Sequence, residues 1–242
     1  KCATTEHLIL TICDHFEPFH KADHRTAIQR INQWSEGYAQ NTERFIDSSG
    51  ISPRHTFFYP IEQYNEEVVS DLAELCSSTG CETEMHLHHN DDTPENLRET
   101  LAKGKAELAR HQLLSADDSG NVVFGFIHGN WALANCDPRG INCGVTDEIK
   151  ILQQSGCYAD FTMPSAPHPT QPKTINSIYY STTKGLNPLD DGCASTVGTS
   201  NRKGLLMVQG PLGLNWQRRK WVVFPRVENG SITGSNPPTS KR

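Results

Sequence analysis

The chain has 242 residues, of which 36% are hydrophobic and 21% are charged, with a formal net charge of −6 at pH 7. This composition is typical of a globular protein, and we expect a single domain over residues 1–242. The acidic balance disfavours a nucleic-acid partner, and the lack of an apolar run of roughly 20 residues excludes a membrane-spanning helix.

Neither the chain start nor the cysteines fix a cellular compartment. No signal-peptide pattern begins the chain, so the cytoplasm and the extracellular or periplasmic space both stay open. Eight cysteines are too few for a disulfide scaffold. Cys76 with Cys81, and Cys136 with Cys143, are close enough in sequence to pair, but we expect mainly buried thiols. The oligomeric state also stays open.

Short apolar runs alternate with helical patterns along most of the chain. We expect strands over residues 7–13, 55–59, 82–88, 122–127 and 158–163, and helices over 26–45, 68–75, 93–108 and 149–152. Beyond Pro164 the pattern is less regular, and strands are expected at 205–208 and 221–224.

This alternation predicts an α/β fold with a mostly parallel sheet. The sequence carries no Gly-x-Gly-x-x-Gly or Gly-Lys-Ser/Thr element after a strand, which disfavours nucleotide-binding folds. We therefore expect a (β/α) barrel rather than a doubly wound sheet.

Polar residues follow three of the predicted strands. They are Asp14 and His15, the run from His86 to His89, and His128. In parallel barrels the carboxyl ends of the strands meet at one mouth, where catalytic groups are found. The sequence therefore predicts that these residues share a site.

The histidines of the third strand have the spacing of metal ligands. His86 and His88 are two residues apart, so both side chains face the same side of a strand. A carboxylate from another strand, Asp14, would complete the set. A lone histidine at a strand end is usually an ordinary polar residue, but three within four positions are unusual. We expect one divalent ion, with zinc favoured over cobalt, nickel or iron.

The order of three segments resembles the polysaccharide deacetylase (NodB-homology) superfamily. The segments are Leu10 to Asp14, His55 to Phe58, and Gly80 to His88. The similarity covers roughly residues 7 to 165. It implies a distorted (β/α) barrel that hydrolyses acetyl groups on a carbohydrate with a bound metal ion.

The resemblance also implies roles for individual residues. The metal would be held by Asp14, His88 and either His86 or Asp92, since Asp92 stands where the family carries its second histidine. Asp14 or Asp92 would act as the base. His128, which stands in place of the family's arginine, would be the acid or electrophile. Apart from the resemblance, their positions near the strand ends make His15, Glu17, His89 and Trp131 candidates for substrate contacts.

Two other functions and one structural departure follow from the same residues. Cys13 stands where a family member carries a carboxylate, which favours a non-catalytic carbohydrate-binding domain. A glycoside hydrolase would instead need two carboxylates about 5–10 Å apart. The family's late Leu-x-His strand is absent, because no histidine follows His168. We therefore expect a barrel that is incomplete at its C-terminus and exposes a strand edge.

Overall fold

A computed structural model describes residues 9–181, 189–190, 192–195, 204–234 and 236–239. In chain order its elements are β1 (Cys13–His15), α1 (His24–Thr42), β2 (Thr56–Pro60), η1 (Ile61–Gln63), α2 (Glu66–Thr79), β3 (Glu82–Leu87), α3 (Pro94–Arg110), β4 (Phe124–His128), η2 (Leu133–Asn135), α4 (Glu148–Ser155), β5 (Cys157–Asp160), β6 (Ile178–Ser181), β7 (Gly192–Ala194), β8 (Leu206–Val208), β9 (Gly213–Lys220) and β10 (Phe224–Glu228).

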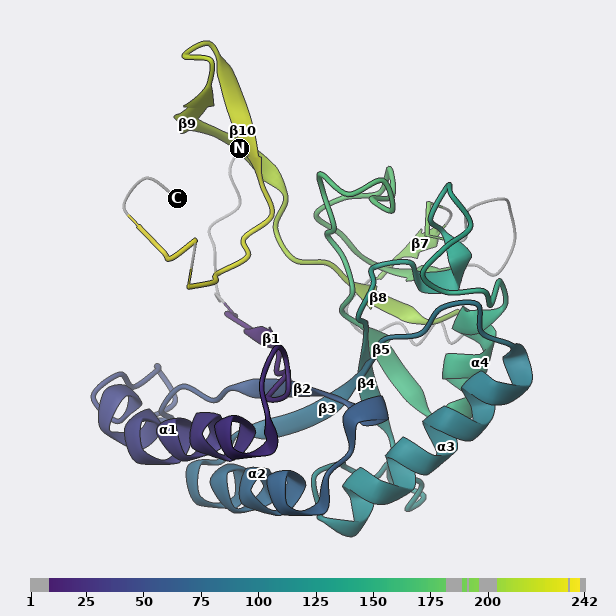
Figure 1. The fold of residues 1–242 in the computed structure, drawn as a ribbon. Coiled ribbons are helices and arrows are strands. Elements are labelled where there is room, and N and C mark those ends of the chain that lie inside the picture. Colours follow the sequence, from purple (N-terminus) through teal and green to yellow (C-terminus); the bar gives the residue numbers. More distant parts are fainter. Residues whose placement is uncertain (1–8, 182–188, 191, 196–203, 235, 240–242) are drawn as a thin grey trace.

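Eight strands form one sheet in the order β1-β2-β3-β4-β5-β8-β6-β7. The pairs from β1 to β5, and the pair β5 with β8, are parallel. Strand β6 runs antiparallel to both β8 and β7. The sheet is curved, and the four α-helices lie along its outer side (Figure 1).

Side-chain caps start the helices where the sequence changes from strand to helix. Asp23 accepts a hydrogen bond from the Thr26 N–H at 2.9 Å, and Thr93 accepts one from Asn96 at 3.2 Å. Such caps satisfy backbone donors that have no partner in the first turn. Helix α2 ends at Gly80, whose φ of 71° is the left-handed conformation that glycine adopts without a steric penalty.

The core is formed by the sheet and the inner faces of the helices. Leu72 and Leu75 of α2, and Leu97 and Leu101 of α3, are fully or almost fully buried against the strands. Phe57 lies beside them on β2 and is 0% exposed. This packing fixes the strands, and with them the loops that leave their carboxyl ends.

The expected α/β class and mostly parallel sheet are confirmed, whereas closure into a barrel is not shown. Within the described part of the chain no pairing joins β1 to β7, so both are edge strands. Incompleteness at the C-terminus stays a prediction. The first strand is also later than expected: only Cys13–His15 pair with β2, and Leu10 is 85% exposed.

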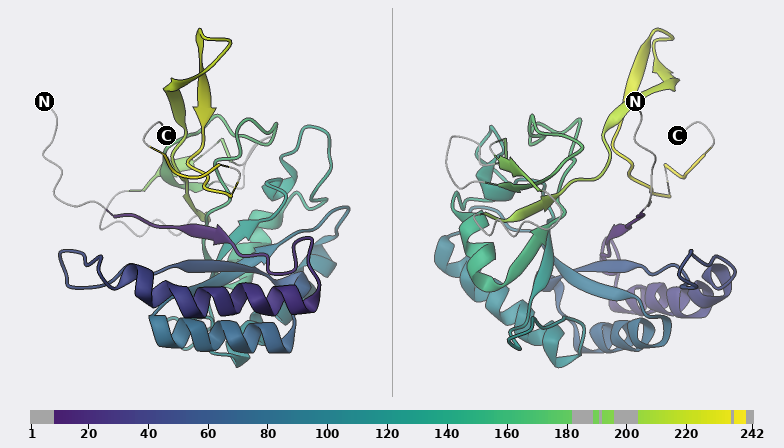
Figure 2. Two further views of the ribbon diagram at one scale, coloured as in Figure 1. Left: turned by 60° about the vertical axis from the view of Figure 1, so that its left-hand side comes forward. Right: turned by 180° about the vertical axis from the view of Figure 1, so that it is seen from behind.

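The hairpin of β9 and β10 projects away from the sheet (Figure 2). The strand expected at 221–224 is wrong for its first three residues, which form the turn between β9 and β10. Apolar content predicted a strand there, but Trp221 and Val222 have φ of 51° and 67°, outside the extended range of a strand. Val222 is 83% exposed.

Two further expectations concern cysteines and membranes. Each of the seven cysteines in the described ranges is a free thiol, so neither Cys76 with Cys81 nor Cys136 with Cys143 is bridged. Among the described residues, none of the helices is long and apolar enough to span a bilayer.

Candidate metal centre

The carboxyl ends of β1, β3 and β4 carry two groups of metal-ligand side chains. His86 of β3 is the register partner of Ile127, and Leu87 is the partner of His128. Because successive side chains of a strand point to opposite faces, His86 and His128 lie on opposite faces of the sheet. The histidines predicted to share one site are therefore divided between two.

The first group, the Glu17 cluster, consists of His15, Glu17, His86 and His88. One ligand atom each from His15, Glu17 and His86 lie within 4.8 Å of one another. Glu17 Oε1 is 3.4 Å from His86 Nε2 and 3.5 Å from His88 Nε2. One carboxylate oxygen thus faces two imidazole nitrogens that come from a different strand.

Hydrogen bonds on the far side of each ring prepare these histidines to bind a cation. His86 Nδ1 donates to the Ile127 carbonyl at 3.0 Å, and His88 Nδ1 donates to Glu62 Oε1 at 2.7 Å. In a neutral ring this leaves the Nε2 lone pair directed at Glu17. His86 Nε2 is buried and has no hydrogen-bond partner.

The charges around the Glu17 cluster favour an added positive charge. The close approach of the His86 and His88 imidazoles holds the pKa of Glu17 well below its usual range. The carboxylates of Glu17 and Glu62 raise the pKa of His88 to about 9. Burial, together with nearby His86, lowers the pKa of His15 to about 4, so this ring is neutral. A proton or a cation can supply the positive charge.

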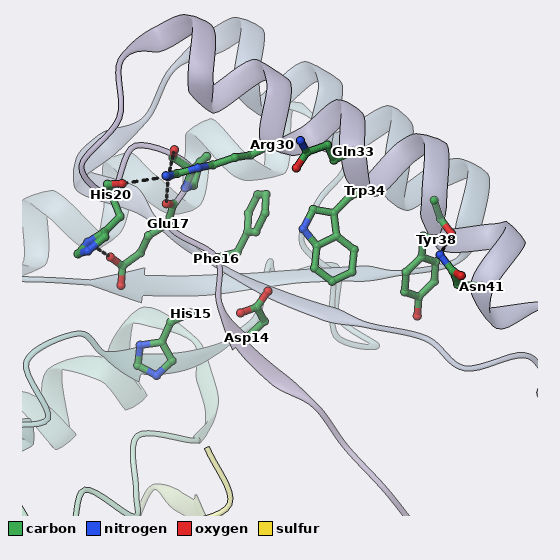
Figure 3. A pocket seen from close by; sticks show the side chains of 12 residues that line it. Asp14, His15, Phe16, Glu17, His20, Arg30, Gln33, Trp34, Tyr38 and Asn41 are labelled. Atoms are coloured by element: carbon green, nitrogen blue, oxygen red, sulfur yellow. Dashed lines mark hydrogen bonds and ion pairs between the residues drawn. The ribbon is translucent and has the colours of Figure 1, made fainter. Parts of the chain in front are cut away.

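Arg30 of α1 holds the turn that presents Glu17. Its Nη1 donates to the Pro18 carbonyl at 2.7 Å and to the His20 carbonyl at 3.0 Å. Glu17 also contacts His20 Nδ1 at 3.2 Å. Figure 3 shows the guanidinium directed into this turn. The carboxylate therefore stands on a fixed backbone.

A pocket of about 800 Å³ opens beside the cluster, between β1 and α1. Its wall combines aromatic rings of Phe16, Trp34 and Tyr38 with the polar groups of Gln33 and Asn41 (Figure 3). His15 and Glu17 line the same pocket. Apolar walls with a few polar groups are typical of small-molecule sites.

Asp14 lies in this pocket but not in the Glu17 cluster. Its Oδ2 is 3.1 Å from Nε2 of His55, which is buried and packs against Trp34 with ring centroids 4.7 Å apart. The structure thus brings Glu17, rather than Asp14, to the two strand histidines. Asp92 is also elsewhere, because its Oδ2 accepts a hydrogen bond from His89 Nδ1 at 2.9 Å.

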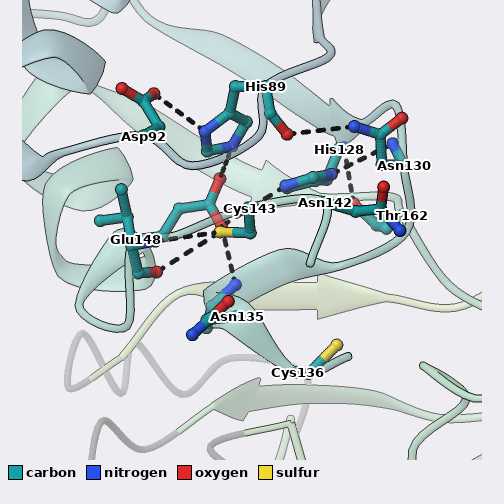
Figure 4. Close-up of polar contacts among 12 residues, drawn as sticks. His89, Asp92, His128, Asn130, Asn135, Cys136, Asn142, Cys143, Glu148 and Thr162 are labelled. Carbon is teal, nitrogen blue, oxygen red and sulfur yellow. Dashed lines mark hydrogen bonds and ion pairs between the residues drawn. The ribbon is translucent and has the colours of Figure 1, made fainter. Parts of the chain in front are cut away.

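The second group, the Glu148 cluster, is buried and consists of His89, His128, Cys143 and Glu148 (Figure 4). One ligand atom from each residue lies within 4.8 Å of the others, and the cluster can hold a metal ion. Glu148 Oε1 is 3.0 Å from His89 Nε2, and Glu148 Oε2 is 3.8 Å from His128 Nε2. Burial lowers the pKa of His128 to about 4, so this ring is neutral.

The remaining predicted residues lie apart from the Glu17 cluster. His128 is 0% exposed and belongs to the Glu148 cluster, as does His89. Trp131 is exposed, and the centroid of its ring lies 5.5 Å from that of His168. The structure thus assembles His15, Glu17, His86 and His88 from the predicted set and separates the others from them.

Three residues of the two sites were not predicted from the sequence. Glu62 lies two residues after the end of the second strand, a position typical of site residues, so the sequence could have pointed to it. Glu148 looks like an ordinary first-turn acid of a helix, and Cys143 looks like an ordinary buried thiol. Only the fold brings the last two together.

No family model, curated protein or solved structure shows significant similarity to the chain. The assignment of metal sites therefore rests on the geometry of the two clusters.

Proposed function

We propose that the chain is a metal-dependent hydrolase that removes acetyl groups from a carbohydrate, and that Glu17, His86 and His88 hold its ion. The observation that carries the metal site is the approach of two imidazole Nε2 atoms to one carboxylate oxygen, at 3.4 and 3.5 Å. Imidazole and carboxylate ligands are the usual set of catalytic zinc sites. His15 is a further candidate ligand, because its ligand atom lies within 4.8 Å of those of Glu17 and His86.

A bound zinc-class ion supplies a Lewis acid and makes water nucleophilic at neutral pH. We assign the base to Asp14. Asp14 lines the same pocket, and its Oδ2 is held by His55 at 3.1 Å, so its other oxygen is free to accept a proton. Proton transfer to a positioned carboxylate is a common hydrolytic step.

The carbohydrate and acetyl parts of the proposal rest on the pocket lining and on the family resemblance. Trp34 and Tyr38 offer flat apolar faces, and Gln33, Arg30 and Asn41 offer polar groups. Such a lining suits a molecule with apolar faces and many hydroxyl groups, which describes a sugar ring.

The test measures acetate release from acetylated amino-sugar oligomers by the zinc-loaded chain. Glu17→Gln should lower the rate more than roughly 100-fold, because it replaces a charged ligand. The matched control is Glu36→Gln, which alters an exposed glutamate of α1 outside the pocket. Reducing ends without acetate would assign a glycoside hydrolase, and glycan binding without any product would assign an accessory domain.

A further inference from the structure

We propose that the Glu148 cluster is a second cation site, in which His89, Cys143 and Glu148 bind a zinc-class ion and His128 closes the remaining side. This site is separate from the one proposed for hydrolysis. Its residues come from the loop after β3, the end of β4, the connection between β4 and α4, and the first turn of α4. One ion would tie these segments together.

Each of the three ligands is prepared by a neighbouring group. Asp92 Oδ2 accepts from His89 Nδ1 at 2.9 Å, which aims His89 Nε2 at Glu148 Oε1, 3.0 Å away, where an ion would replace the shared proton. The Ala134 N–H donates to Glu148 Oε2 at 2.7 Å. The Val145 N–H donates to Cys143 Sγ at 3.4 Å, and the Cys143 thiol points at Glu148 Oε2, 3.3 Å away. Burial raises the pKa of this thiol, so an ion that binds here replaces its proton. Such supporting hydrogen bonds orient metal ligands in proteins.

His128 provides an independent sign that a partner is missing from the cluster. Its Nδ1 accepts a hydrogen bond from the Asn130 N–H at 3.2 Å, so the proton of the neutral ring is on Nε2. That Nε2 is fully buried, faces Glu148 and has no hydrogen-bond partner. An unpaired buried donor is costly. His128 therefore does not bind the ion itself. Its Nε2–H would donate a hydrogen bond to the fourth, non-protein ligand of the ion.

The backbone of the loop between β4 and α4 is held next to the cluster by close contacts. Gly144, with φ of 101°, brings the loop so close to Asp92 that an added Cβ would lie 2.5 Å from the Asp92 nitrogen. The Asp92 N–H donates to the Cys143 carbonyl at 3.0 Å. Ala134, with φ of 55°, turns its N–H toward Glu148. The loop thus places the thiol and the carboxylate together.

The donor set and the burial determine the class of ion. Thiolate, imidazole and carboxylate together suit zinc and disfavour magnesium or calcium, which prefer oxygen ligands alone. His128, Cys143 and Glu148 are buried, and the pocket beside Glu17 does not include them.

The cobalt-substituted chain tests this site without any activity assay. Cys143 is the only thiol in either cluster. A near-ultraviolet thiolate-to-cobalt absorption band is therefore expected from the Glu148 cluster and not from the Glu17 cluster. Elemental analysis should give two ions per chain. The His86→Ala, His88→Ala double variant should lose one ion and keep the band.

Cys143→Ser should lose the band and keep the ion at the Glu17 cluster. The control is Cys157→Ser, which alters a buried thiol outside the Glu148 cluster and should keep the band and both ions. Should Cys143→Ser fail to fold, the wild-type spectrum decides. Absence of the band from the folded, cobalt-loaded chain would overturn the proposal, as would a band that survives in Cys143→Ser. A chain without the ion at the Glu17 cluster would still show the band. The experiment therefore distinguishes failure of the proposed hydrolase site from failure of the Glu148 site.

Discussion

His88 and His89 are adjacent in the chain but contact different carboxylates in different clusters. His88 Nε2 is 3.5 Å from Glu17, whereas His89 Nε2 is 3.0 Å from Glu148. The extended backbone at the end of β3 separates them, because successive side chains point to opposite sides. A single run of histidines therefore serves two polar clusters.

Gly129→Ala should displace His88. A Cβ at Gly129 would lie 2.3 Å from the His88 ring, which is far inside contact distance. The ring would have to leave its position beside Glu17, and we expect the affinity of that cluster for zinc to fall roughly 10–100-fold. A chelator competition titration measures this. Gly213→Ala is the control, because nothing lies within 4 Å of its added Cβ. Equal zinc affinity in both variants would contradict the assignment of His88.

Glu62→Gln should weaken the same site without touching the ion. Glu62 accepts the His88 Nδ1 proton at 2.7 Å, and a neutral amide makes this a weaker hydrogen bond and a less basic imidazole. We expect a loss of roughly 10-fold in zinc affinity. Glu67→Gln is the matched control, because Glu67 contacts exposed His24 at 3.3 Å. A Glu62 variant that binds zinc as the wild type does would remove Glu62 from the site.

Local patterns in the sequence predicted the α/β class and the strand ends. Periodicity located β2, β3 and β4, and the alternation of His86 and His88 correctly placed both on one side. Those features depend on neighbours within a few residues, which is the range over which such patterns act.

The choice of carboxylate depended on three-dimensional structure. Asp14 and Glu17 are three residues apart, and the turn fixed by Arg30 decides which of them reaches the histidines. The Glu148 cluster depends on contacts between residues 59 positions apart, as between His89 and Glu148. Spacing in the sequence carries no information about either.

Two glycines of α-helices should respond to alanine in opposite directions. At Gly37 of α1 the nearest atom to an added Cβ is Asn41 Nδ2 at 3.5 Å, so Gly37→Ala should raise the free energy of unfolding by up to about 1 kcal/mol. At Gly104 of α3 three Ile61 atoms lie within 2.8 Å. Overpacking there costs roughly 1–3 kcal/mol and exceeds the helical gain. Urea denaturation measures both, and a stabilised Gly104→Ala would show that α3 and Ile61 are less tightly packed.

Asp160 should make the stability of the fold depend on pH. Burial raises the pKa of this carboxyl to about 7, although Thr162 donates to both of its oxygens, at 2.7 and 3.0 Å. The folded state therefore binds the proton more tightly than the unfolded state does. Its stabilising contribution is complete below about pH 4 and is lost as the pH rises through 7.

Asp160→Asn should remove this dependence, because the amide stays neutral and keeps an oxygen that accepts from Thr162. At about 1.4 kcal/mol per pKa unit, the free energy of unfolding of the variant relative to the wild type should increase by roughly 2–4 kcal/mol between pH 4 and pH 8. Urea titrations at several pH values measure that difference, and the wild type cancels the contributions of all other groups. A difference that stays constant with pH would mean that Asp160 is already ionised in the folded protein at low pH, with its charge stabilised by the Thr162 hydrogen bonds.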